Sequence, residues 1–305
     1  MSVFFGGGSD IPAHYLQWGG ATISTAIDKY VYVAVGKTPQ NHIKVNYSKQ
    51  ELVTNVNDIQ NEIVKNALHY FGITGNIEIT TFADIPTVGT GLAGSSAFTC
   101  ALVAALAEYC GFEPYNEYEL AEAACQIEIL MCQWNIGKQD QYASAFGGMN
   151  YIKYLNSDRV VVSRMDPNGI DNYMVLIPTN IQRHAAEVLD KIDFKDRSFI
   201  IRAMSRMADH KHMSLPTLSE YGSMLNEAWD LKRQMEEGIT NTEIDSLYER
   251  CLDAGATGAK LLGAGGGGYM LALTDNRNKL KAEFYDRVCL DVKVARDGAR
   301  VVYKD

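Results

Sequence analysis

Residues 89–99 read Gly-Thr-Gly-Leu-Ala-Gly-Ser-Ser-Ala-Phe-Thr and lead directly into an Ala- and Leu-rich segment. Small residues allow a backbone to pass close to a ligand, and glycine adopts loop conformations that other residues resist. Because residues 97–109 are rich in strong helix formers, we expect Ser95 and Ser96 to lie where a helix begins. Unpaired N–H groups and the helix dipole make such a junction a site for phosphate. A flexible loop with a serine N-cap would give the same pattern.

This loop is not a Walker P-loop, which needs Gly-Lys-Ser/Thr after its glycines, because Ala97 and Phe98 follow the serines. Three further segments combine glycines with charged residues. They read Phe5-Gly6-Gly7-Gly8-Ser9-Asp10, Ile136-Gly137-Lys138-Gln139-Asp140 and Lys260-Leu261-Leu262-Gly263-Ala264-Gly265-Gly266-Gly267-Gly268. Each glycine run alone is weak evidence of function. The four segments together, in this order, are strong evidence for a specific nucleotide-binding architecture.

In this order the segments resemble those of the GHMP kinase superfamily, which includes galactokinase, homoserine kinase, mevalonate kinase and phosphomevalonate kinase. Within it, the chain is similar to the D-glycero-D-manno-heptose 7-phosphate 1-kinases. That narrower resemblance rests on residues 5–12, 24–33, 137–143 and 255–268. It extends from about residue 4 to the C-terminus and so covers nearly the whole chain.

The resemblance implies an α+β protein with the two-lobed GHMP kinase fold. An N-terminal lobe like ribosomal protein S5 domain 2 is expected over residues 1–178, and a ferredoxin-like C-terminal lobe over residues 179–305, where the composition shifts. It also implies ATP-dependent, Mg²⁺-dependent phosphorylation of the anomeric hydroxyl of a heptose 7-phosphate. The 1,7-bisphosphate would lead to nucleotide-activated heptose for surface glycans. A 1-kinase of an unphosphorylated fucose- or galactose-like sugar, or a non-catalytic sugar-binding protein, are the alternatives.

The same resemblance assigns binding residues. The ATP-binding residues it implies are Gly89, Gly91, Leu92, Ala93, Gly94, Ser95, Ser96, Ala97, Gly265 and Gly266. The substrate-binding residues it implies are Gly7, Gly8, Ser9, Asp10, Asp140 and Arg183. Arg183 is expected at a helix start, where a guanidinium could bind a sugar phosphate through two hydrogen bonds, or simply face solvent.

Glu128 is the candidate metal ligand. If residues 117–133 form one helix, Ala121, Ala124 and Glu128 lie along its apolar stripe, so the carboxylate is directed inward. An ionised carboxylate there is costly unless it is paired or bound to a metal. A buried salt bridge to Lys138 is one explanation. The other is a Mg²⁺ ligand, and the resemblance then makes Glu128 and Ser96 the metal-binding pair.

Asp140 is the candidate general base, and Lys138 is a second catalytic candidate. Phosphoryl transfer to an alcohol needs a group that accepts the hydroxyl proton, and Asp140 would do this for the sugar. Lys138 would lower the charge on Asp140 or on the transferring group. A helix-capping aspartate and a solvated lysine are the alternatives for these two positions.

Two departures from the resembled family stand out. The family usually reads Gly-Leu-Gly-Ser-Ser, and here Ala93 intervenes, which leaves the alignment of the two serines uncertain by one position. The family also carries a strand and an arginine before its first glycine motif, whereas this sequence is given from Met1. Either the true start lies upstream, or another cation serves, or activity is reduced.

Composition sets broader limits. The chain has 305 residues, 47% of them hydrophobic, and a net charge of −9, which argues against a nucleic-acid surface. No apolar run is long enough for a transmembrane helix, and no signal-peptide pattern is present, so we expect a cytoplasmic protein without a membrane partner. The six cysteines show no Cys-x-x-Cys pair and are expected to be buried free thiols. The oligomeric state is left open, a homodimer included.

Periodicity predicts alternating strands and helices. Strands are expected within 20–36 and at 76–83, 149–154, 159–164 and 173–178. Helices are expected at 57–71, 97–109, 117–133 and 138–146, and over most of 183–256. The final 50 residues are expected to run strand, helix, strand, strand. No glycine loop lies in a strand–loop–helix unit with an acid about 20 residues on, which excludes a Rossmann dehydrogenase.

Overall fold

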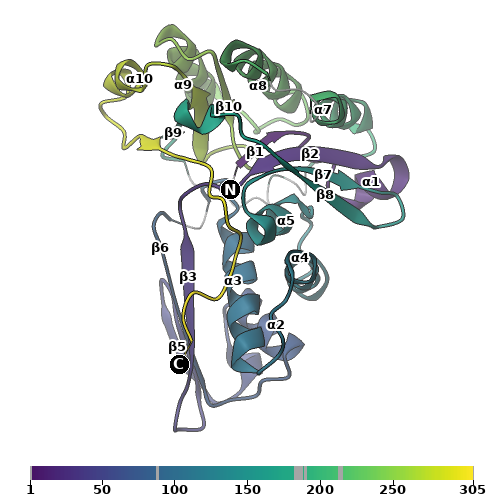
Figure 1. Cartoon of the computed structure of the whole chain (residues 1–305), viewed down its shortest axis with the longest axis vertical. Coiled ribbons are helices and arrows are strands. Elements are labelled where there is room, and N and C mark those ends of the chain that lie inside the picture. Colours follow the sequence, from purple (N-terminus) through teal and green to yellow (C-terminus); the bar gives the residue numbers. More distant parts are fainter. Residues whose placement is uncertain (1, 87–88, 182–187, 189–190, 212–215, 305) are drawn as a thin grey trace.

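The described residues form three four-stranded sheets with helices packed on them (Figure 1). This computed structural model describes the chain except residues 1, 87–88, 182–187, 189–190, 212–215 and 305. Strands and helices are mixed along the chain, as the α+β prediction requires. Two of the sheets are built from residues up to Met165, and the third is built from residues from Met174 onward.

The first sheet crosses the middle of the molecule between two groups of helices. Its order is β1-β2-β7-β8, and all its neighbours are antiparallel. The strands are β1 (Ser2–Phe5), β2 (Gly20–Thr25), β7 (Met149–Tyr154) and β8 (Val160–Met165). Helix α5 (Gln139–Phe146) contacts one side, and α7 (Ser198–Lys211) and α8 (Leu218–Lys232) contact the other (Figure 1).

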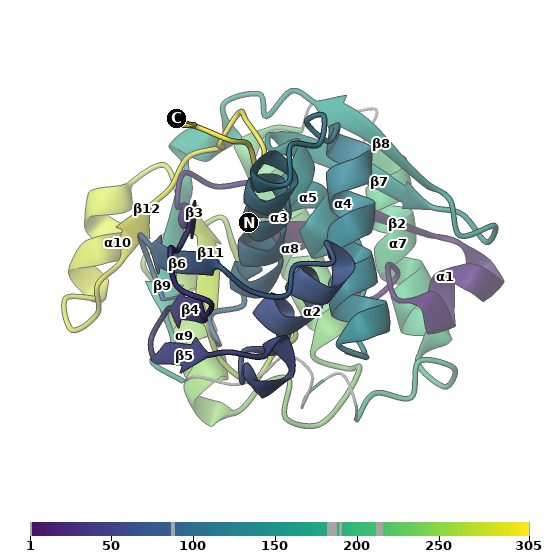
Figure 2. The ribbon, with the colours of Figure 1, turned by 90° about the horizontal axis from the view of Figure 1, so that it is seen from below.

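The second sheet, of order β3-β6-β4-β5, stands at one side of the N-terminal lobe. Its strands are β3 (Val31–Lys37), β4 (Ile43–Asn46), β5 (Gln50–Val53) and β6 (Ile77–Ala83). Seen from below, α3 (Gly94–Tyr109) lies between this sheet and α4 (Glu117–Cys125) (Figure 2). The remaining elements of this half are α1 (Pro12–Trp18), the 3₁₀ turn η1 (Val56–Asp58), α2 (Glu62–Tyr70) and the π-helical turn η2 (Gln126–Met131).

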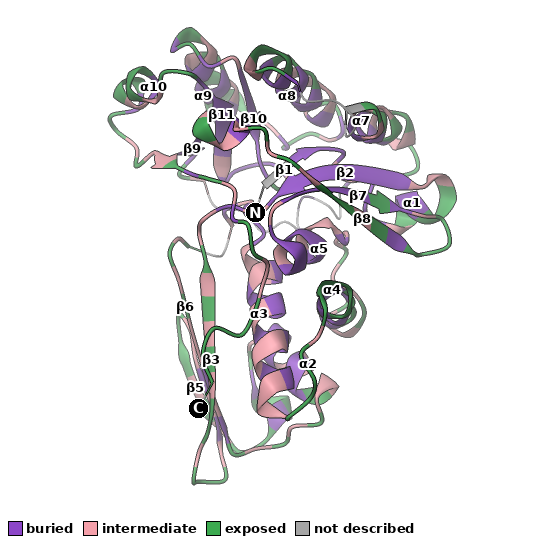
Figure 3. Cartoon of the chain, viewed as in Figure 1, coloured by how far each residue is buried: buried purple, intermediate pink, exposed green. Residues whose placement is uncertain are grey.

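The third sheet, of order β10-β11-β9-β12, is the core of the C-terminal lobe. Its strands are β9 (Met174–Pro178), β10 (Gly258–Leu261), β11 (Tyr269–Leu273) and β12 (Leu290–Asp291). The 3₁₀ turn η3 (Ile170–Asn172) precedes β9, and α9 (Thr242–Asp253) and α10 (Arg277–Glu283) complete the lobe. Buried residues gather where helices meet sheets, whereas the outer sides of α9 and α10 are exposed (Figure 3).

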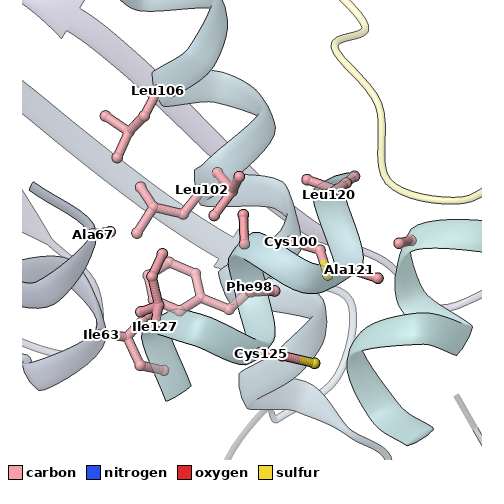
Figure 4. Packing of buried hydrophobic residues seen from close by; sticks show 14 of the residues in the cluster. Ile63, Ala67, Phe98, Cys100, Leu102, Leu106, Leu120, Ala121, Cys125 and Ile127 are labelled. Carbon is pink, nitrogen blue, oxygen red and sulfur yellow. The ribbon is translucent and has the colours of Figure 1, made fainter. Parts of the chain in front are cut away.

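Apolar side chains of α3 fix the position of the glycine loop that precedes it. Phe98, Leu102 and Leu106 lie in the cluster where α3 meets α2, represented by Ile63 and Ala67 (Figure 4). These side chains are buried, and burying each contributes on the order of 1.5–3 kcal/mol before the entropy of ordering the chain is counted. The helix is therefore a rigid support for the residues at its N-terminus.

The structure bears on two predictions, that the cysteines are free thiols and that the chain has no transmembrane helix. The six cysteines are free, with Cys100, Cys125 and Cys251 buried and Cys110, Cys132 and Cys289 only partly so. Within the described ranges, no helix combines the length and apolarity needed to span a bilayer.

Most predicted elements are confirmed, and three predictions need correction. The helix expected at 57–71 is broken, because Asn55 caps η1 and Asn61 then caps α2 through the Val64 amide. The helix expected at 117–133 ends as α-helix at Cys125 and continues as the wider turn η2. The final segment runs strand, strand, helix and short strand, because the 263–268 glycines connect β10 directly to β11.

The predicted division into residues 1–178 and 179–305 also needs correction. β9 lies before that boundary, yet it pairs with β11 and β12 in the C-terminal sheet. By sheet membership the C-terminal lobe therefore begins before Met174. Sequence composition could not show this, because strand pairing over about a hundred residues is a non-local property.

Candidate active site

Residues 89–93 form a tight turn and residues 94–97 the first turn of helix α3, and we call the two together the 89–97 loop. Gly89 and Gly91 have φ angles of 70° and 68°, and the N-cap residue Ala93 is also left-handed, with φ of 55°. The helix begins at Gly94, and within the described part of the chain no side-chain cap bond is formed at its N-cap residue, Ala93. The alternative of a serine N-cap is therefore wrong. The first-turn amides are left for an external acceptor, which is the arrangement that binds phosphate at helix N-termini.

The C-terminal glycine run packs directly on this loop. A Cβ added to Gly263 would lie 2.4 Å from the Cα of Gly91, and one added to Gly268 would lie 2.4 Å from the carbonyl oxygen of Thr90. The amide of Tyr269 also donates to the Thr90 carbonyl, at 3.1 Å. Only glycine permits such close backbone approach. Two segments that the sequence analysis assigned to one nucleotide site thus lie against each other.

The middle of the C-terminal run is held by the segment that follows α8. The amide of Gly266 donates to the Ile239 carbonyl at 2.8 Å, and a Cβ on Gly265 would lie 3.0 Å from the Cα of Ile239. Gly265 has φ of 120°, a conformation that side chains disfavour. The backbone requirement explains both glycines without a ligand, so their predicted contact with ATP stays a prediction.

Glu128 lies at the centre of a buried hydrogen-bond cluster between α3, η2 and α5. Its Oε2 accepts from Ser96 Oγ at 2.8 Å and from Gln141 Nε2 at 2.5 Å, and its Oε1 accepts from Thr99 Oγ1 at 3.0 Å. Burial raises the pKa of Glu128, and the hydrogen bonds that it accepts oppose this shift. No cation pairs with it among the described residues, so the alternative of a salt bridge to Lys138 is wrong.

The oxygen atoms around Glu128 suit a magnesium ion. Mg²⁺ takes one or two protein carboxylates and completes its shell with phosphate oxygens and water. Ser96 and Glu128 offer a hydroxyl and a carboxylate side by side, and the buried Oε1 of Gln141 has no hydrogen-bond partner among the described residues. In the part of the chain that the structure describes, no group of three or more His, Cys, Asp or Glu could hold a metal alone. Ser96 and Glu128 therefore fit a magnesium ion whose remaining ligands are nucleotide phosphate oxygens and water.

Asp10 is held against the start of α5 by backbone contacts. Its Oδ2 accepts from the amide of Gln139 and its Oδ1 from the amide of Gly8, each at 3.1 Å. Its carbonyl accepts from the amide of Lys138 at 3.2 Å. A Cβ on Gly137 would lie 1.8 Å from Asp10 Oδ2, so only glycine fits at that position. These contacts bring the first glycine segment to the helix that carries the predicted base.

Asp10 and Asp140 have carboxyl groups with displaced pKa values. Burial raises the pKa of Asp10 to about 6. Burial and the charge of Asp10 together raise the pKa of Asp140 to about 7. A base with a pKa near the working pH combines a large ionised fraction with useful proton affinity. The N-cap of α5 is Lys138, with no side-chain cap bond, so the capping alternative for Asp140 is wrong.

The Lys138 side chain contacts Asp158 and Glu122 and forms no ion pair with Asp140 among the described residues. Its Nζ donates to Asp158 Oδ1 at 2.9 Å, lies 3.8 Å from Glu122 Oε1, and stands 5.8 Å from the centre of the Tyr15 ring. Two acidic partners and an aromatic face account for a buried ammonium group. These contacts give no support to the catalytic role predicted for Lys138.

The small residues of the segment 6–10 form hydrogen bonds that hold the local backbone. Ser9 Oγ donates to the carbonyl of Gly6 at 2.7 Å, and it accepts from the amide of Ala21 at 3.1 Å. These bonds occupy the hydroxyl, so they give no support to the sugar contact predicted for Ser9. Gly8 donates its amide to Asp10, and a Cβ added to Gly8 would lie 3.5 Å from the Met235 side chain; Gly7 precedes it in the same turn.

Arg183, the predicted phosphate ligand, lies outside the described residues. Sequence reasoning also missed three residues of the site: Thr99, Gln141 and Gly137. Thr99 could have been found from its helical spacing of three residues after Ser96. Gln141 and Gly137 carry no local signal, because their roles depend on Glu128 and Asp10 from other segments.

Two parts of the chain match known protein families. Residues 57–148 match the family described as GHMP kinases N terminal domain, and residues 214–287 match GHMP kinases C terminal. The chain belongs to the GHMP kinase family. The N-terminal match spans the glycine loop, Glu128 and Asp140, so this GHMP kinase carries its candidate phosphate loop and predicted base within the shared region.

Relatives with named activities are similar over most of this GHMP kinase. D-glycero-alpha-D-manno-heptose 7-phosphate kinase from Campylobacter jejuni is 28% identical over 90% of this chain and 87% of its own length. The bifunctional fucokinase/GDP-fucose pyrophosphorylase from Arabidopsis thaliana is 26% identical over 95% of this chain but 31% of its own length.

A solved structure shares the fold. The crystal structure of a D-glycero-D-manno-heptose 1-phosphate kinase from Bacteroides thetaiotaomicron superposes with a TM-score of 0.73, at 23% identity, over 99% of this chain and 97% of that chain. This likeness confirms the predicted two-lobed GHMP kinase fold.

Proposed function

We propose that this chain is a sugar 1-kinase that transfers the γ-phosphoryl group of ATP to the anomeric hydroxyl of a heptose 7-phosphate, giving the 1,7-bisphosphate. The observation that carries the proposal is the buried Ser96–Glu128 contact in the first turn of α3, directly after the glycine-rich turn at residues 89–93. It places a fitting pair of magnesium ligands beside a phosphate-binding turn. Similarity to the Campylobacter jejuni heptose 7-phosphate kinase supports the choice of sugar.

The nucleotide would bind where the two glycine loops meet. GHMP kinases use ATP as phosphate donor, generally with Mg²⁺. The first-turn amides of α3 would bind phosphate oxygens, and Ser96 and Glu128 would hold the ion, with Gln141 and Thr99 orienting the carboxylate. The ion would supply positive charge that offsets the negative charge of the phosphate groups during transfer.

Asp140 would accept the proton of the anomeric hydroxyl as that oxygen attacks the γ-phosphorus. The O–P bond to the sugar forms, the bond from the γ-phosphorus to the bridging oxygen of ATP breaks, and ADP leaves. Asp10 would accept hydrogen bonds from neighbouring sugar hydroxyls. Burial and the charge of Asp10 raise the pKa of Asp140 to about 7, so that Asp140 would be a competent base at neutral pH.

A second candidate is a 1-kinase of an unphosphorylated sugar. The Arabidopsis thaliana fucokinase is similar over 95% of this chain, and a Lactococcus lactis galactokinase complexed with galactose shares the fold at a TM-score of 0.73 and 18% identity. The two candidates differ in whether a phosphate group is recognised. Both would place the protein in the cytoplasm, where ATP and phosphorylated sugars are supplied.

The test is a panel of sugars and sugar phosphates incubated with Mg·ATP while ADP release is recorded. We expect the highest kcat/KM with a heptose 7-phosphate and a much lower value with the same heptose lacking its phosphate. Equal values for both compounds would favour the second candidate. ADP release that no sugar stimulates would contradict the proposed function altogether.

A further inference from the structure

Lys232, in the last turn of α8, is a buried lysine whose oxygen partners among the described residues are backbone carbonyls, and burial lowers the pKa of its amino group. Its Nζ donates to the carbonyl of Leu261 at 3.0 Å and to that of Gly263 at 2.6 Å, and it stands 5.9 Å from the centre of the Trp229 ring. Removing an ammonium group from water is costly unless other oxygens take its hydrogen bonds. Among the described residues, the oxygen atoms that accept hydrogen bonds from Lys232 are these two backbone carbonyls. Lys232 therefore depends on these two carbonyls.

The two carbonyls flank the point where the C-terminal lobe touches the phosphate loop. Leu262 lies between them, and a Cβ on Gly91 would lie 2.8 Å from the Leu262 carbonyl oxygen. The amide of Leu262 is held from the other strand by the Tyr269 carbonyl, at 2.9 Å. The backbone at 261–263 is thus fixed by β11 on one side and by the Lys232 ammonium on the other.

We propose that Lys232 is a positioning residue that keeps the 261–263 backbone seated on Gly91 and thereby sets the affinity of the protein for the nucleotide. The inference rests on the proposed function, in that the 89–97 loop binds ATP. Lys232 itself does not touch the nucleotide. It acts through the Gly263 contact, where a displacement of a few tenths of an ångström changes the fit of two interlocked backbones.

The test compares the wild type with Lys232→Met, which keeps an unbranched apolar side chain but removes the donors. We expect the KM and the Kd for Mg·ATP to rise roughly tenfold, since the two hydrogen bonds that hold the 261–263 backbone are lost. The KM for the sugar and kcat at saturating ATP should change little. Amide hydrogen exchange in a peptide covering 262–269 should become faster. Lys232→Arg, which keeps a cationic donor, should recover part of both effects.

Leu280→Ala is the matched control, because Leu280 is fully buried in the same lobe. It lies on α10, a helix at the outer edge of that lobe (Figure 1). The substitution should lower the melting temperature without changing ATP affinity or exchange at 262–269. Wild-type ATP binding and exchange in Lys232→Met, or the same changes in Leu280→Ala, would overturn the inference. If the wild type bound Mg·ATP but phosphorylated no sugar, the proposed function would fail, while ATP binding and exchange would still decide the role of Lys232.

Discussion

Replacing Asp140 with asparagine removes the proposed proton acceptor while keeping the size of the side chain. General-base assistance typically contributes about 10²–10⁴-fold to rate, so we expect kcat to fall by at least two orders of magnitude. ATP should still bind, because the 89–97 loop is not altered. A purely orienting role would instead raise the KM for the sugar and leave kcat nearly intact.

The pH dependence makes this prediction sharper. An acid whose pKa is about 7 is about one-tenth ionised at pH 6 and about nine-tenths ionised at pH 8, so wild-type kcat should rise roughly ninefold over that range. The residual activity of Asp140→Asn should not follow this curve. Asp245→Asn, a substitution on the distant helix α9, is the control and should keep the wild-type profile.

The same variant makes a prediction about stability. The pKa of Asp140 is raised from 3.8 to about 7, so the native state holds this proton more tightly than the unfolded state does. The resulting stabilisation is present below the unfolded pKa and is lost as pH rises toward 7. Asp140→Asn should therefore match the wild type near pH 4 and exceed its free energy of unfolding at pH 8, by up to about 4 kcal/mol.

Denaturant unfolding at both pH values measures this difference, and kinetic assays at saturating sugar across pH 6–8 measure the catalytic effect. The reasoning about Asp140 would be refuted by an Asp140→Asn variant that retains wild-type kcat at saturating sugar. It would also be refuted by a pH profile of that variant identical to the wild type.

The remaining predictions concern the metal, the glycine contact and the sugar phosphate. Glu128→Gln should raise the Mg²⁺ concentration needed for half-maximal activity and lower kcat, with little change in sugar binding and no loss of stability, because a buried charge is removed; unchanged kinetics at low Mg²⁺ would reject the metal assignment. Gly263→Ala should raise the KM for ATP at least severalfold, because its Cβ would meet the Gly91 backbone at 2.4 Å, whereas Gly36→Ala, where a Cβ meets nothing within 4 Å, should leave that KM unaltered. Arg183→Ala should lower kcat/KM for a sugar phosphate roughly 10- to 150-fold more than for its dephosphorylated analogue; equal losses would mean that the phosphate is bound elsewhere.

Local patterns in the sequence predicted the parts of the site that depend on neighbouring residues. The start of α3 at the serines follows from the change from small residues to helix formers, and the inward direction of Glu128 follows from its place in an apolar stripe. The meeting of Ser96 with Glu128 came from the family resemblance, because 32 residues separate them.

What the sequence could not show depends on contacts between distant segments. The π-helical turn at 126–131 and the ion pair that takes Lys138 to Asp158 have no local signature. The close contact of Gly137 with Asp10 and the place of β9 in the C-terminal sheet likewise require the folded chain. In each case contacts between distant segments determine the structure, and the local sequence does not favour one arrangement over another.

The central claim, phosphorylation at the anomeric position, is tested most directly by identifying the product. The wild-type protein would be incubated with Mg·ATP and a heptose 7-phosphate, and the products followed by phosphorus-31 NMR with proton coupling. The account predicts one new phosphate monoester coupled to the anomeric proton, with the original 7-phosphate unchanged and one ADP formed for each product molecule. A new phosphate coupled to any other proton of the sugar, or ADP formed without a sugar product, would contradict it.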